Sequence, residues 1–85
     1  MTEIKYVIKD EMGIHARPAG ELIKACAAYP CKILICKDGK EMDAKRIMGV
    51  MALGVKSGEE ITVNVEGDDE DTAATEIEAF FKATM

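Results

Sequence analysis

The sequence predicts a two-layer α/β sandwich with the element order βαββαβα. Residues 3–9 and 60–67 alternate apolar and polar side chains, which is the period of a strand with one covered face. Residues 18–29 and 70–85 place apolar side chains at helical spacing, and an Asp-Gly pair separates two further apolar segments. Because strands with one polar face need their helices on the other face, we expect two layers. The strand order does not follow from these patterns.

The length and composition fit one soluble domain that spans residues 1–85. Of the 85 residues, 48% are hydrophobic and 32% are charged. No apolar stretch approaches the roughly 20 residues that span a bilayer. The net charge of -5 disfavours a general binder of nucleic acids or of anionic membranes. We therefore expect a cytoplasmic monomer that binds no nucleic acid and does not insert directly into a membrane.

The first two elements are a strand and an amphipathic helix. In residues 3–9, Ile4, Tyr6 and Ile8 alternate with mostly polar side chains. In residues 18–29 apolar side chains recur at i, i+3, i+4 and i+7, and a proline follows that ends the helix. These apolar side chains are Ala19, Leu22, Ile23 and Cys26.

The central elements are a hairpin and a short helix. The segments CKILIC and KEMDA, residues 31–36 and 40–44, flank Asp38 and Gly39. This pair favours a type I′ turn because both positions tolerate positive φ. Residues 46–55 contain more apolar side chains than one face of a short helix can bury, and a glycine at position 54 is a natural stop for the helix.

The last two elements are a strand and a terminal helix. Isoleucine and valine alternate with polar residues in residues 60–67, and Gly67 ends the strand. Asp68 and Asp69 precede the helix at residues 70–85, where acidic side chains favour a helix start. The apolar stripe of this helix consists of Ala73 or Ala74, Ile77, Phe80, Phe81 and Met85.

The three cysteines do not form a recognisable metal or redox motif. Cys26, Cys31 and Cys36 include no CxxC pair, and no histidine lies at zinc-finger spacing from them. We expect reduced thiols that serve as small apolar side chains and no metal site. A zinc site built from the thiols is the alternative.

The only histidine lies where a helix is expected to begin, in GIHARPAG at residues 13–20. Pro18 lacks an N–H and fits the first helical turn, which places His15 at or beside the N-cap. A helix N-terminus presents free N–H groups and about half a positive charge, and Arg17 adds a guanidinium group suited to phosphate oxygens. These positive surroundings favour the neutral, nucleophilic imidazole, so the site can accept and hold a phosphoryl group. The alternative is an ordinary N-cap histidine beside a solvated arginine.

GIHARPA, together with IMGVMALGV at residues 47–55, closely resembles the motifs of the HPr family. These are the histidine-containing phosphocarrier proteins of the bacterial phosphoenolpyruvate-dependent sugar phosphotransferase system. The resemblance covers essentially the whole chain, including the separation of the motifs, the length, the hairpin and the terminal helix. It implies an open-faced α+β sandwich in which a four-stranded antiparallel sheet of order 1-4-2-3 carries three helices on one face.

The resemblance also implies a function and a site. Enzyme I, phosphorylated by phosphoenolpyruvate, would transfer its phosphoryl group to Nδ1 of His15, and the carrier would deliver it to the A component of an enzyme II. Arg17 matches the arginine that assists transfer, and the backbone of Ala16 and Arg17 would hold the phosphate. The carrier would bind no cofactor and would be a protein substrate rather than an enzyme.

A partner-binding surface is implied around the second helix. In the family this helix packs one side inward and offers the other side to partners. We therefore expect Ile47, Met48 and Met51, together with Gly20, to contact enzyme I and the enzyme II A component. Methionine side chains adapt to differently shaped partners. The alternative is that these apolar side chains belong to the core.

Arg46 and Gly20 depart from the pattern of the family. Many Gram-positive members have a serine at the position of Arg46, which HPr kinase/phosphorylase phosphorylates to slow phosphotransfer and to recruit a catabolite repressor. Arginine cannot be phosphorylated by this kinase, so we expect the serine switch to be absent. As an N-cap, arginine also lacks the side-chain acceptor of serine, which costs about 1 kcal/mol. Gly20 stands where threonine is frequent and leaves the backbone near the histidine more open.

A second function is open from the sequence. An HPr-like paralogue can act as a regulatory or interaction module outside sugar transport, with His15 vestigial or only regulatory. Such a module would bind partners through the surface around Met48 whether or not His15 is present.

Overall fold

The computed structural model describes all 85 residues and contains the seven predicted elements in the predicted order. The strands are β1 (Thr2–Val7), β2 (Lys32–Lys37), β3 (Lys40–Asp43) and β4 (Glu60–Glu66). The helices are α1 (Ala16–Ala27), α2 (Ile47–Ala52) and α3 (Glu70–Thr84). None of the three helices has the length and apolar composition that crossing a membrane requires.

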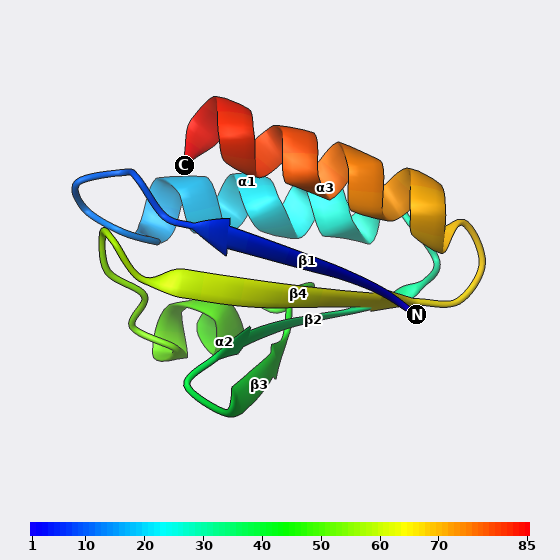
Figure 1. The fold of residues 1–85 in the computed structure, drawn as a ribbon, viewed down its shortest axis with the longest axis horizontal. Helices are drawn as coiled ribbons and strands as arrows, with labels where there is room; N and C mark the ends of the chain where they lie inside the picture. Colours follow the sequence, from blue (N-terminus) through cyan, green and yellow to red (C-terminus); the bar gives the residue numbers. More distant parts are fainter.

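The four strands form one antiparallel sheet in the order β1-β4-β2-β3 (Figure 1). β4 is the last strand in the chain but lies between β1 and β2, and Val63 of β4 is opposite both Ile4 and Ile35. The order 1-4-2-3 that the family resemblance implies is confirmed.

The core lies between the sheet and the helices. α1 and α3 run side by side across the sheet, and α2 lies near β3 (Figure 1). The 21 buried hydrophobic residues form one cluster, to which β1, β2, β4 and all three helices contribute. Its largest fully buried side chains include Phe81, Ile8, Leu22, Ile33, Ile35, Ile61 and Ile77. The predicted alternation of apolar and polar side chains along the strands thus has a physical basis in this one-sided core.

The turn between β2 and β3 is the predicted two-residue hairpin. Lys37 pairs with Lys40, so Asp38 and Gly39 form the loop. Their φ angles are 49° and 81°. Positive φ at both central positions defines the type I′ turn that the Asp-Gly pair predicts.

α1 begins and ends two residues earlier than predicted. It spans Ala16–Ala27 rather than residues 18–29, and His15 is its N-cap. Pro18 therefore occupies the third helical position instead of the first. Its missing N–H is harmless there too, because the first intrahelical bond runs from the Ala19 N–H to the His15 carbonyl, at 2.9 Å.

α2 is shorter than the apolar segment that predicts it. It ends at Ala52, and Gly54 follows the C-cap residue with a φ of 61°. The Gly54 N–H donates to the Met51 carbonyl at 3.1 Å, so the predicted stop at this glycine is confirmed. Val50 is the only buried residue within α2. The surplus of apolar side chains in this segment therefore faces outward.

Candidate functional site

The imidazole ring of His15 lies at the N-terminus of α1 without capping it. The His15 backbone is extended, with φ of −110° and ψ of −175°, and the side chain makes no capping hydrogen bond. The side chain is 31% exposed. As the first two residues of the helix, Ala16 and Arg17 have N–H groups with no intrahelical carbonyl to bind. A nucleophilic ring and unpaired backbone donors therefore occur at the same helix end.

Arg17 leaves its guanidinium group free. Its side chain is exposed and takes part in none of the ion pairs of the chain. It lies two residues after His15, on the first turn of α1. An unpaired guanidinium beside a helix N-terminus can bind the oxygens of a phosphoryl group with a fork of N–H donors.

A turn at Gly13 places His15 at the start of α1. Gly13 has a φ of 67° and donates its N–H to the Asp10 carbonyl at 2.9 Å. The next N–H, that of Ile14, donates to the Val55 carbonyl at 3.0 Å. A Cβ at Gly13 would lie 2.2 Å from this same carbonyl oxygen. Only glycine fits both the left-handed backbone and the close approach to the segment after α2.

Asp10 is a neighbour of the histidine that the sequence motifs did not indicate. Its Oδ2 lies 3.6 Å from Nε2 of His15, and its Oδ1 accepts a hydrogen bond from the Met12 N–H at 2.9 Å. The ring therefore has a negatively charged neighbour in addition to the positive helix N-terminus and Arg17 that the sequence predicts. The signal in the sequence is DEMG at residues 10–13, which is typical of an Asx turn that ends at a glycine.

The expected partner surface is exposed beside α1. Ile47 is 40%, Met48 79% and Met51 41% exposed, and α2 contacts α1. These three side chains are not part of the core, which removes the alternative that they are. Gly20 of α1 is half-buried, and a Cβ added to it would meet nothing within 4 Å.

Arg46 is the N-cap residue of α2, as predicted. Its backbone is extended, and its side chain makes no capping hydrogen bond. The side chain is 82% exposed, and its Nε lies 3.8 Å from Oδ2 of Asp43. The position where many family members have serine is thus an open helix start occupied by a solvated arginine.

The cysteines are free thiols, and two of them belong to the core. Cys26 and Cys31 are buried, and Cys36 is half-buried. Burial raises the pKa of the Cys26 thiol to about 12. Burial and the nearby Glu41 carboxylate raise the pKa of Cys36 as well. No group of three or more His, Cys, Asp or Glu side chains is placed to hold a metal ion.

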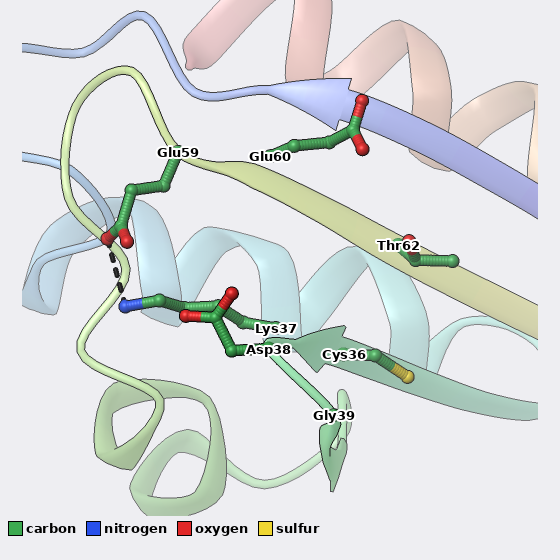
Figure 2. A pocket seen from close by; sticks show the side chains of 7 residues that line it. All are labelled: Cys36, Lys37, Asp38, Gly39, Glu59, Glu60 and Thr62. Carbon is green, nitrogen blue, oxygen red and sulfur yellow. Dashed lines mark ion pairs between the residues drawn. The ribbon is translucent and has the colours of Figure 1, made fainter.

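The one pocket of the structure lies at the hairpin and contains none of the residues of the histidine site (Figure 2). Its volume is about 400 Å³, and it is lined by Cys36, Lys37, Asp38, Gly39, Glu59, Glu60 and Thr62. Nζ of Lys37 lies 2.9 Å from Oε1 of Glu59 and donates to the carbonyls of Leu53 and Gly54. These contacts join β2 to the end of α2 and to the start of β4, so they hold α2 in place.

We expect the Lys37–Glu59 pair to make the stability of the fold depend on pH. Hydrogen bonds from Lys37 and from the Lys56 N–H hold the pKa of the Glu59 carboxyl below its usual value. Because the folded-state pKa is lowered, this stabilisation is fully present above the unfolded-state pKa of about 4.3. It is lost as the pH falls through the folded-state pKa.

Glu59→Gln should therefore lower the free energy of unfolding in urea at pH 7, and the deficit should disappear in acid, below the folded-state pKa of Glu59. Glu60→Gln is the matched control, because Glu60 is an exposed neighbour without an ion pair. A deficit of the same size at pH 7 and in acid would contradict this interpretation.

Comparison with known proteins identifies the family. The family model described as "PTS HPr component phosphorylation site" matches residues 2–83. The phosphocarrier protein HPr of Mycoplasma capricolum subsp. capricolum is 40% identical over 73 residues, which cover 86% of this chain and 82% of that protein.

Solved structures are similar over almost the whole chain. The histidine-containing phosphocarrier protein from Mycoplasma superposes with a TM-score of 0.94 at 36% identity, covering 98% of this chain and 94% of that one. Crh of Bacillus subtilis, a catabolite repression protein described as a swapped, intertwined dimer, superposes with a TM-score of 0.79 at 32% identity, covering 98% and 95%. The chain belongs to the HPr family of phosphocarrier proteins of the phosphotransferase system.

Proposed function

We propose that this chain carries a phosphoryl group on Nδ1 of His15, which it accepts from phosphorylated enzyme I and passes to the A component of a sugar-specific enzyme II. The observation that supports this best is the position of the ring. It is a partly exposed imidazole at the N-cap of a 12-residue helix, it has no capping role, and it lies two residues from an unpaired arginine. A nucleophile is thus present where a phosphate is best stabilised.

The transfer uses only groups of this chain and the two partner proteins. The lone pair of Nδ1 attacks phosphorus, the bond from phosphorus to the donor breaks, and the donor keeps that electron pair. The N–H groups of Ala16 and Arg17 and the guanidinium of Arg17 compensate the charge of the phosphoryl oxygens. In the second transfer the N–P bond breaks and Nδ1 takes back its electron pair. The chain is therefore a substrate of phosphotransferases and not an enzyme, and it needs no bound cofactor.

Incubation with enzyme I and phosphoenolpyruvate tests this function. We expect one acid-labile phosphate per chain, measured as a single mass increase in the intact protein. His15→Ala should abolish it while leaving the circular dichroism spectrum unchanged, because the ring makes no capping bond. An acid-stable phosphate on a serine or threonine, or no phosphate at all, would refute the proposal.

The proposed partners bind at the exposed surface of α2. Ile47, Met48 and Met51 are apolar and solvent-exposed beside α1, and Gly20 leaves room at the facing helix. Such a patch supports docking of enzyme I and of the enzyme II A component next to His15. We further propose that the carrier is monomeric and cytoplasmic, as expected of a protein that binds enzyme I and the enzyme II A component.

The serine switch of many relatives is proposed to be absent. Arg46 has no hydroxyl group, and the only serine of the chain, Ser57, is outside α2. HPr kinase/phosphorylase and ATP should therefore incorporate no phosphate into the wild-type chain. Arg46→Ser should gain one phosphate per chain, because it supplies an exposed hydroxyl at the start of α2. Phosphate on Ser57 of the wild type would show that the switch has moved.

A regulatory or interaction module outside sugar transport is the second candidate. The similarity to Crh, together with the exposed apolar side chains of α2, favours it. It predicts that wild type and His15→Ala bind their partner equally, and that neither takes up phosphate from enzyme I. Uptake of phosphate by the wild type decides in favour of the carrier.

A further inference from the structure

The loop between β1 and α1 presents a carboxylate to the ring nitrogen opposite the proposed phosphoryl acceptor. Oδ2 of Asp10 lies 3.6 Å from Nε2 of His15. The two side chains are 27% and 31% exposed. The separation is an ion-pair distance, about half an ångström longer than an N–H···O hydrogen bond. Contacts of this kind tighten when charge develops on one partner.

Backbone hydrogen bonds hold Asp10 in place and thereby fix the position of its carboxylate. The Asp10 N–H donates to the Met85 carbonyl at 3.0 Å, and the Asp10 carbonyl accepts from the Gly13 N–H at 2.9 Å. Figure 1 shows the C-terminal end of the chain beside this loop. Oδ1 accepts the Met12 N–H at 2.9 Å, which leaves Oδ2 to face the ring. Oδ1 closes the turn and Oδ2 is directed at the histidine, so the carboxylate loses little conformational freedom when it contacts the ring.

We propose that Asp10 is a positioning residue for phosphoryl transfer: its carboxylate attracts the proton of the ring to Nε2 and leaves Nδ1 of His15 unprotonated as the acceptor. This inference rests on the proposed function of His15. A carboxylate that accepts from one ring nitrogen of a histidine fixes which nitrogen carries the proton.

The same carboxylate balances the charge of the phosphorylated ring. When Nδ1 forms its bond to phosphorus and the bond to the donor breaks, the donor keeps the electron pair and Nε2 keeps its proton. The ring then carries a positive charge, and its contact with Asp10 becomes a charge-assisted hydrogen bond. When the phosphoryl group leaves, the electron pair of the N–P bond returns to Nδ1. Arg17 thus stabilises the phosphoryl end of the adduct, and Asp10 stabilises the ring end.

Asp10→Asn separates the charge of this side chain from its role in the turn. The asparagine Oδ1 can still accept the Met12 N–H, but the anionic partner of the ring is lost. Asp38→Asn is the matched control: it removes one negative charge from an exposed hairpin position, where asparagine also tolerates the φ of 49°. Asp38 lines the hairpin pocket and is not part of the histidine site.

Nitrogen NMR of the neutral His15 ring measures the ratio of the Nε2–H to the Nδ1–H tautomer. In Asp10→Asn this ratio should fall about twofold to threefold, as the loss of an exposed charge contact implies, and it should not change in Asp38→Asn. The wild-type ring provides a check that requires no variant, because a majority of the Nδ1–H tautomer in the wild type overturns the proposal.

The initial rate of phosphate uptake from enzyme I is the second measurement. It should fall about fivefold in Asp10→Asn and stay at the wild-type value in Asp38→Asn. If the wild type takes up phosphate but Asp10→Asn leaves the tautomer ratio or the rate unchanged, the inference fails and the carrier function stands. If the wild type takes up no phosphate, the carrier function fails, and the role of Asp10 in transfer fails with it.

Discussion

Arg17→Ala should slow the transfer of phosphate from enzyme I to His15 by about 100-fold or more. The arginine makes no ion pair in the free protein, so its guanidinium is available to the developing charge on the phosphoryl oxygens. Removal of one positioned donor from a transition state typically costs a factor of about 100 to 1,000. Rapid-quench measurement of labelled phosphate uptake gives the rate directly.

Two further variants show whether the geometry of Arg17 matters or only its charge. Arg17→Lys should recover only part of the rate, because an ammonium group is a point charge and not a fork of donors. Lys82→Ala removes one positive charge from the last turn of α3 and should leave the rate unchanged. Equal slowing in Lys82→Ala and Arg17→Ala would mean that net charge, and not a phosphate contact, explains the effect. The fold should be intact in all three.

Phe81→Ala should lower the free energy of unfolding by about 3 to 5 kcal/mol. The Phe81 side chain is fully buried, and its ring lies 5.5 Å from the Tyr6 ring and 5.8 Å from the Phe80 ring between centroids. Truncation removes apolar contacts between α3 and β1 and leaves a cavity. The loss is a large part of the 5 to 15 kcal/mol or so that stabilises a typical domain. Urea titration followed by circular dichroism measures it.

Phe80→Ala is the control for this core contact. Phe80 undergoes the same chemical change one residue earlier but is only partly buried. Phe80→Ala should lower the free energy of unfolding clearly less than Phe81→Ala does, because less apolar area returns to water and no enclosed cavity forms. Similar losses for the two variants would contradict the assignment of Phe81 to the centre of the core.

The local elements could be predicted from the sequence because each is determined by nearby residues. The alternation around Ile61 marks a strand with one covered face, and Asp38-Gly39 sets the turn through the φ angles it tolerates. The start of α1 was misplaced by two residues because proline is acceptable at any of the first helical positions. The first and last residues of an element depend on such small differences in residue preference. Whether the element is a helix or a strand does not.

The arrangement of the elements could not be predicted from these local patterns. β4 lies between β1 and β2, and this pairing depends on contacts between distant parts of the chain. Only the resemblance to a family indicated the order. The same limit applies to the site. The histidine motif gave His15 and Arg17, but Asp10 reaches the ring through a turn that ends at Gly13, and residue types alone do not specify that approach.

The nitrogen that carries the phosphate tests the carrier function most directly. The chain labelled with nitrogen-15 in its histidine can be phosphorylated by enzyme I and phosphoenolpyruvate and examined by nitrogen and phosphorus NMR. We predict a single phosphoryl group on Nδ1 of His15, with the proton on Nε2 facing Asp10. A phosphoryl group on Nε2 would contradict the assignment of Nδ1 as the acceptor atom, and a phosphoryl group on another residue, or no phosphoryl group at all, would contradict the assignment of His15 as the carrier.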